Sequence, residues 1–94
     1  MNKNYILGFE RVNYLNKEGK EINGYKIYYT YKSKKDTVKG VISDSIYISN
    51  NEYNQKLIED LERIDNFPIE GTLFIRRSKY EEGKFYLSGY NLND

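Results

Sequence analysis

The sequence contains no cysteine and no histidine, and its only proline is Pro68. Without cysteine, the chain can form neither a disulfide framework nor a thiolate metal site. Without histidine, it lacks the most common general base and the most common zinc ligand. It also lacks an apolar run near the ~20 residues that span a bilayer, and its first residues lack the apolar region of a signal peptide. We therefore expect a cytoplasmic protein with no membrane contact and no cofactor.

Positive charge is barely in excess, because 15 Lys and Arg residues stand against 14 Asp and Glu residues. The charges are unevenly distributed: residues 1–40 carry a net +5, residues 41–69 a net −4, and residues 70–94 are balanced. The near-zero total therefore comes from two opposed regions. At 94 residues, with no linker or repeat, we expect one domain, 1–94.

What the chain has in quantity is β-strand patterning. Alternation of apolar and polar residues, bounded by polar segments that contain glycine, predicts strands over 4–15, 25–32, 41–49, 72–80 and 85–92. Gly8 lies inside the first of these strands and would allow it to bend and serve two sheets.

The period changes in residues 50–65, where a helical stripe predicts one helix; the stripe consists of Tyr53, Leu57, Ile58, Leu61 and Ile64. Ser49 and Glu52 form a candidate capping box before it. The predicted order is β-β-β-α-β-β, a mainly β fold with one helix. This is the element order of a small OB-like Greek-key barrel. An open α+β sheet with one covering helix has the same order, so that alternative stays open.

The segment "GYKIYYTYKSKK", residues 24–35, combines tyrosines with lysines. Alternation splits it into two faces: Tyr25, Tyr29 and Tyr31 fall with Ile27, as expected for the core or its rim. Tyr28 falls on the other face between Lys26 and Lys32. If the second and third strands pair, Tyr28 and Tyr47 share an outer face, and strands 2 and 3 carry the face that OB-folds use for oligonucleotides.

Binding of single strands needs aromatic rings on which bases stack and cations that follow the phosphates. The loop 33–40 adds lysines beside this face, and a second basic cluster precedes the last hairpin turn, where a loop could close over the strand from the other side. The candidate nucleic-acid-binding residues are therefore Lys26, Tyr28, Lys32, Lys34, Lys35, Tyr47, Arg76, Arg77, Lys79 and Tyr80.

Catalysis has little support. Without His or Cys, an enzyme would need a carboxylate pair, a Ser–Lys dyad or a carboxylate-bound metal. Asp44 is a candidate because it lies on the apolar Ile42/Ile46 face of its strand. A carboxylate in such a place more often lies near a bulge, caps a turn or pairs with a lysine. We therefore expect no enzyme and no metal site.

The stretches "GFERVNYLNKEGKEINGYKIYYTY" and "VKGVISDSIYIS" resemble small proteins from phages and conjugative elements of low-GC bacteria. An AT-rich codon origin fits, since Lys, Asn, Ile and Tyr supply 43 of the 94 residues. The "EGK" turn, "GYKIYY" and the closing "GKFYLSGYNL" also resemble the layout of the single-stranded-DNA-binding protein of filamentous phages, over about residues 5–92.

That resemblance implies an OB-fold dimer that coats single strands with lysines, arginines and exposed tyrosines. By position, Lys26 and Tyr28 match the tyrosine strand of the family, and "RRSKY" matches its late basic hairpin. The chain differs from the family by its helix at 50–65 and by its lower positive charge.

Two functions follow as expectations. The first is a non-enzymatic single-stranded-DNA-binding protein of a phage or mobile element, acting as a homodimer. The alternative is an inhibitor of a host defence nuclease, comparable to anti-CRISPR proteins. Its acidic helix would then mimic nucleic acid and contact the nuclease through Glu59, Asp60 and Glu62.

Overall fold

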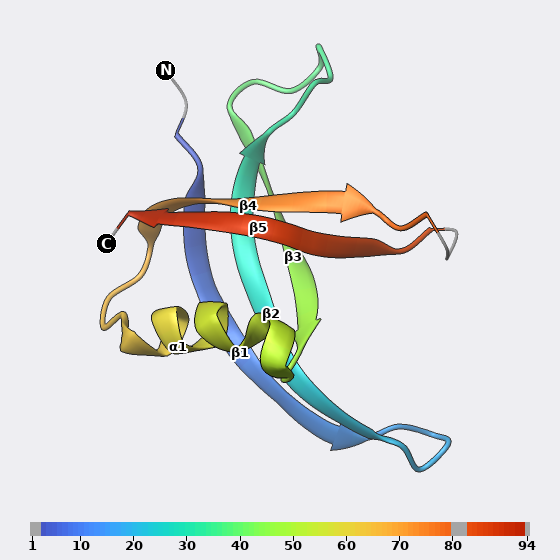
Figure 1. Ribbon diagram of the computed structural model, residues 1–94. Coiled ribbons are helices and arrows are strands. Elements are labelled where there is room, and N and C mark those ends of the chain that lie inside the picture. Colours follow the sequence, from blue (N-terminus) through green and yellow to red (C-terminus); the bar gives the residue numbers. More distant parts are fainter. Residues whose placement is uncertain (1–2, 80–82, 94) are drawn as a thin grey trace.

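Figure 1 shows the computed structural model of the chain, which describes residues 3–79 and 83–93. The mainly β fold with one helix between the third and fourth strands is confirmed. The elements are β1 (Tyr5–Leu15), β2 (Glu21–Lys32), β3 (Val41–Ser49), the 3-10 turn η1 (Glu52–Asn54), α1 (Gln55–Arg63), β4 (Ile69–Arg77) and β5 (Phe85–Asn93).

Two strands begin earlier than predicted. A short turn before β2 and a partner strand beside β4 explain the two differences. β2 begins at Glu21 because the β1–β2 turn is short: the Asn16 side-chain oxygen accepts the Glu18 and Lys20 N–H groups at 2.9 Å. β4 begins at Ile69 because it pairs there with Ile6 of β1. Neither the turn nor the pairing is visible in the alternation of apolar and polar residues along the sequence.

The five strands form one antiparallel sheet in the order β3-β2-β1-β4-β5. β1 joins β4 only through the pairs Tyr5–Glu70 and Ile6–Ile69. The sheet therefore has two parts, a three-stranded part β3-β2-β1 and the hairpin β4–β5. Figure 1 shows the hairpin crossing one face of the three-stranded part, with α1 beside it on the same side. We call this covered side the inner face and the opposite side the outer face.

The sheet curls over its inner face without closing. In the described part of the chain, no pairing joins the end strands β3 and β5. The sheet is therefore not a closed barrel, and of the two predicted architectures the open sheet with one covering helix agrees with it. We refer to the opening between β3 and β5 as the seam.

A bulge lets β1 serve both parts of the sheet. The pairing of β1 with β2 shifts register between Ile6 and Gly8. Gly8 has a φ angle of 159°, a backbone conformation that residues with a side chain rarely adopt. The predicted bend at Gly8 is therefore confirmed, and it directs the first residues of β1 toward β4.

The hydrophobic core lies between the inner face, the helix and the hairpin. Its fully buried side chains come from β1, β2 and α1, and they are Ile6, Ile27, Leu57 and Leu61. Ile58 and Ile64 of the predicted helical stripe are also buried. Tyr53 is not: its side chain is 77% exposed, because it lies in the 3-10 turn before the helix, where the helical period does not apply.

The predicted capping box is wrong. Ser49 remains in β3, where it pairs with Gly24, so it is not available to cap a helix. The cap is Asn51, whose side chain accepts the Asn54 N–H at 3.1 Å. Asn54 in turn donates to the Ser49 carbonyl at 2.9 Å and holds the start of the helical segment against the end of β3.

Candidate nucleic-acid interface

The outer face of β2 and β3 presents two tyrosines side by side. Lys26 pairs with Tyr47, and Tyr28 pairs with Ser45. Tyr28 and Tyr47 are therefore diagonal neighbours on one face, a relation that separates residues by about 7–8 Å. Their side chains are 36% and 43% exposed. Two aromatic rings thus stand at neighbouring positions on an uncovered sheet surface.

Tyr28 lies in a charged and shallow surrounding. The Lys26 ammonium is 5.5 Å from the centre of its ring, a cation–π distance. Its hydroxyl donates to Glu10 of β1 over 3.4 Å, a long bond between exposed groups. Beside it is a hollow of about 230 Å³, lined by Leu7, Tyr28, Ser43, Asp44 and Ser45. The ring is accessible from this hollow.

Tyr47 rests on a glycine. A Cβ atom added at Gly24 would lie 2.6 Å from the Tyr47 hydroxyl oxygen and 2.7 Å from a carbon of its ring, and it would also meet the Ile48 carbonyl. The ring therefore lies against bare backbone at Gly24, and only a residue without a side chain fits beneath it. This contact holds the end of the ring against the sheet, while the residue remains largely exposed.

The loop 33–40 adds positive charge at the end of these two strands. Lys32, Lys34, Lys35 and Lys39 are all exposed, and Asp36 is the single acidic residue of the loop. The loop is held by its own backbone, since the Lys35 N–H donates to the Ser33 side chain at 3.1 Å and the Val38 N–H to the Lys35 carbonyl. The basic loop thus extends the surface that begins at Lys26.

The late basic hairpin lies elsewhere. Arg76, Arg77 and Lys79 are exposed at the far end of β4, and Tyr80 lies outside the described residues. The guanidinium carbon of Arg77 is 5.9 Å from the centre of the Phe85 ring. Because the β4–β5 hairpin crosses the inner face, this basic group does not join Tyr28 and Tyr47 on the outer one (Figure 1).

The acidic helix is tied to one tyrosine of β2 and one of β5. The Tyr25 hydroxyl donates to Glu62 at 2.7 Å, and the Tyr90 hydroxyl donates to Asp60 at 3.0 Å. The bond to Glu62, with burial, raises the pKa of Tyr25. Burial, with the bond to Asp60, raises the pKa of Tyr90. Two of the three acidic residues predicted for a partner therefore hold the helix on the sheet, and Glu59 alone is exposed without a bonded neighbour in the described residues.

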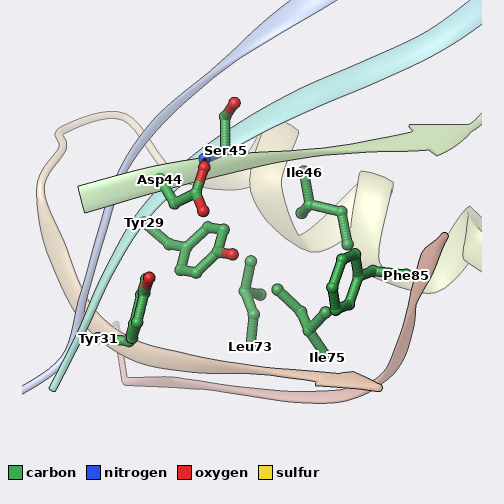
Figure 2. A pocket seen from close by; sticks show the side chains of 8 residues that line it. All are labelled: Tyr29, Tyr31, Asp44, Ser45, Ile46, Leu73, Ile75 and Phe85. Atoms are coloured by element: carbon green, nitrogen blue, oxygen red, sulfur yellow. Dashed lines mark hydrogen bonds between the residues drawn. The ribbon is translucent and has the colours of Figure 1, made fainter. Parts of the chain in front are cut away.

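A larger hollow opens at the seam, and sequence reasoning missed it. It measures about 410 Å³ and is lined by Tyr29, Tyr31, Asp44, Ser45, Ile46, Leu73, Ile75 and Phe85. Figure 2 shows the two tyrosine rings and the Asp44 carboxylate on one side, with the aliphatic side chains and Phe85 opposite. The signal in the sequence was Asp44, which interrupts the apolar inner face of β3 where the seam opens.

Asp44 neither caps a turn nor pairs with a lysine in the described residues, although the sequence analysis favoured roles of this kind. Its side chain is exposed, and one oxygen accepts the Ser45 N–H at 2.7 Å. No ion pair to Asp44 occurs within the described ranges. Burial raises the pKa of the neighbouring Tyr29, and the negative charge of Asp44 raises it further. Across residues 3–79 and 83–93, no group of three Asp or Glu side chains is placed to hold a metal ion.

No helix among the described residues combines the length and the apolar character that crossing a membrane requires. Comparison of the chain with protein-family models, with curated proteins and with solved structures gives no match in any of the three. The function is therefore argued from the chemistry of the surfaces themselves.

Proposed function

We propose that this domain binds single-stranded DNA through the outer face of β2 and β3, as a non-enzymatic protein of a phage or mobile element in the bacterial cytoplasm. The observation that carries the proposal is the pair of exposed tyrosines, Tyr28 and Tyr47, on one uncovered face beside Lys26. Bases stacked on aromatic side chains contribute about 1–3 kcal/mol each, whatever their identity. Such a surface holds a strand without reading its sequence.

The lysines supply the second half of the interaction. Lys26 and Lys32 lie on the same face as Tyr28, and the loop 33–40 continues the positive charge beyond β2. Phosphates that bind there release counterions from the strand. The bond between Tyr28 and Glu10 opposes this arrangement only weakly, because both groups are exposed and their distance is 3.4 Å.

Titration of fluorescently labelled oligo-dT at about 50 and 200 mM salt tests the proposal, because log affinity should fall linearly with log salt concentration with a slope near −0.7 for each phosphate neutralised. Replacing Lys32 by alanine should make the slope shallower by about 0.7. Lys56→Ala, an exposed lysine on the helix, is the matched control and should leave the slope unchanged. A folded protein that fails to bind at the lower salt concentration contradicts the proposal.

The second candidate function is inhibition of a host nuclease through the acidic helix. The observation in its favour is the exposed Glu59, which makes no side-chain hydrogen bond or ion pair within residues 3–79 and 83–93. Charge reversal by Glu59→Lys is therefore the suitable test, whereas reversal at Glu62 would break its bond to Tyr25 and perturb the fold. If the helix is the working surface, Glu59→Lys abolishes inhibition at an unchanged melting temperature. Full inhibition by this variant would rule out the helix.

The homodimer implied by the family resemblance also stays a proposal. Light scattering of the purified chain, with and without oligo-dT, checks it directly. A mass of two chains in both samples supports the dimer, and a mass of one chain in both samples rejects it.

A further inference from the structure

The seam hollow has two unlike walls. On one wall, the rings of Tyr29 and Tyr31 lie with centres 5.9 Å apart and planes inclined by 35°. The opposite wall is mostly aliphatic, with Leu73 and Ile75 of β4 and the Phe85 ring of β5 beside them (Figure 2). A volume of about 410 Å³ lies within the range of small-molecule sites. A pair of tyrosine rings that faces a mostly aliphatic wall suits a flat heteroaromatic ring, which stacks on the tyrosines and packs against the other wall.

Charge in and beside the hollow narrows the choice of ligand. The Asp44 carboxylate lines the hollow. Arg77 does not line it, but its guanidinium carbon is 5.9 Å from the centre of the Phe85 ring, which does. An ammonium ligand, the other usual occupant of an aromatic site, would meet the positive charge of Arg77 there. A ligand with a neutral ring and a phosphate is attracted instead, because the Arg77 guanidinium attracts the phosphate. A nucleotide suits both charges, with its base toward Asp44 and its phosphate toward the side of the hollow where Arg77 lies over Phe85.

Asp44 retains the capacity to recognise such a base. One of its oxygens accepts the Ser45 N–H, and an ionised carboxylate offers about four acceptor positions in all. Guanine presents two adjacent donors, N1–H and the N2 amino group, which match two carboxylate oxygens. Adenine, cytosine and thymine place an acceptor beside each donor on the same edge, and that acceptor repels the carboxylate.

The seam is also continuous with the outer face. Asp44 and Ser45 line both the seam hollow and the hollow beside Tyr28. They can do so because β3 is an edge strand of the sheet. Figure 2 shows the Ser45 side chain directed away from the seam, while the Asp44 carboxylate is directed toward Tyr29. A single strand that lies on Tyr28 therefore reaches the seam by passing over the edge of β3.

We propose that the seam between β3 and β5 is a pocket for one unstacked nucleobase of the bound strand, and that Asp44 makes the pocket prefer guanine. This inference rests on the proposed function, because it assumes that a single strand occupies the outer face. It gives an otherwise sequence-tolerant surface one position at which the base is read.

The test compares labelled oligo-dT with the same oligonucleotide carrying one central dG. The wild-type protein should bind the dG strand about tenfold more tightly, as expected for one bidentate contact to a base. Asp44→Asn should reduce this ratio to about one, since an amide presents a donor to the guanine amino group. Tyr28→Ala should weaken binding of both strands while it preserves the ratio. Because Asp44 is exposed, its variant should keep the wild-type melting temperature.

The outcomes separate the two proposals. Binding of both strands with equal affinity, or a preference that survives Asp44→Asn, overturns the guanine pocket and leaves the outer face intact. Failure of both strands to bind overturns both proposals. NMR titration with guanosine monophosphate locates the pocket independently: shifts should appear at the amides of Tyr31, Asp44 and Phe85. Shifts there with tetramethylammonium chloride but none with the nucleotide would assign the seam to a cation and overturn the inference.

Discussion

The two faces of strand β2 put the same residue type in opposite surroundings. On the inner face, Tyr25 is 4% exposed and donates to Glu62 at 2.7 Å. On the outer face, three residues later, Tyr28 is 36% exposed and its bond to Glu10 is 3.4 Å long. The difference comes from what covers each face, since the helix and the hairpin lie over one and nothing in the described chain lies over the other. A tyrosine-rich strand can therefore build a core and present a binding surface at once.

The inner face itself is covered unevenly. Near α1, Tyr25 is buried and donates to the Glu62 carboxylate of the helix. Toward the loop 33–40, Tyr31 and Asp44 are exposed at the seam, because β5 does not pair with β3. The inner face thus changes from core to pocket along a single strand, and this transition gives the fold its second candidate surface.

Among variants that test the difference between the two faces, one in the core should lose the most stability. Leu61 is fully buried between the helix and the inner face. Leu61→Ala removes methyl groups and leaves a cavity, which typically costs about 2–5 kcal/mol of unfolding free energy. Urea denaturation measures the loss. A loss below about 0.5 kcal/mol, the size of a surface effect, would show that α1 does not pack on the sheet as described.

A smaller effect should distinguish the two tyrosines directly. Tyr25→Phe removes the hydroxyl that bonds Glu62 and should lower the unfolding free energy by about 1 kcal/mol. Tyr28→Phe is the matched control on the outer face, and a surface change of this kind stays within about 0.5 kcal/mol. Both are read from the urea midpoint. Equal losses in the two variants would erase the distinction between the faces.

Alkaline pH should act on the same bonds. The folded state raises the pKa of Tyr25 and Tyr90 above the ordinary value of 10.0, so it binds these protons more tightly than the unfolded chain. Their contribution to stability is complete below pH 10.0 and is lost as pH rises through the higher folded-state pKa values. Urea midpoints should therefore fall from about pH 9 to about pH 11. The variant with phenylalanine at both positions should show a shallower fall, and a fall of unchanged depth would reject the linkage.

Much of the fold could be read from the sequence. Period-two alternation identified all five strands and sorted Tyr25 from Tyr28, and the change of period located the helix. These features are local, because each depends on residues a few positions apart. The placement of Tyr28 and Tyr47 on one face needed only one further assumption, that β2 and β3 pair as a hairpin.

What the sequence could not predict depends on distant contacts. The start of β4 depends on its pairing with Ile6, and the roles of Asp60 and Glu62 depend on tyrosines from two different strands. The seam is likewise a property of the whole sheet. No short sequence pattern predicts that β3 and β5 stay apart. The sequence therefore did not indicate that Tyr31 and Phe85 line one hollow.

The most direct test of the outer face is the affinity of Tyr28→Ala for oligo-dT, measured beside Tyr53→Ala. Both variants remove an exposed tyrosine, and Tyr53 lies in the 3-10 turn on the helix side of the molecule. Loss of one stacking ring should weaken binding by about tenfold or more in Tyr28→Ala, at an unchanged melting temperature. Tyr53→Ala should bind as the wild type does. Wild-type affinity in Tyr28→Ala would contradict the assignment of the outer face as the surface that binds single strands.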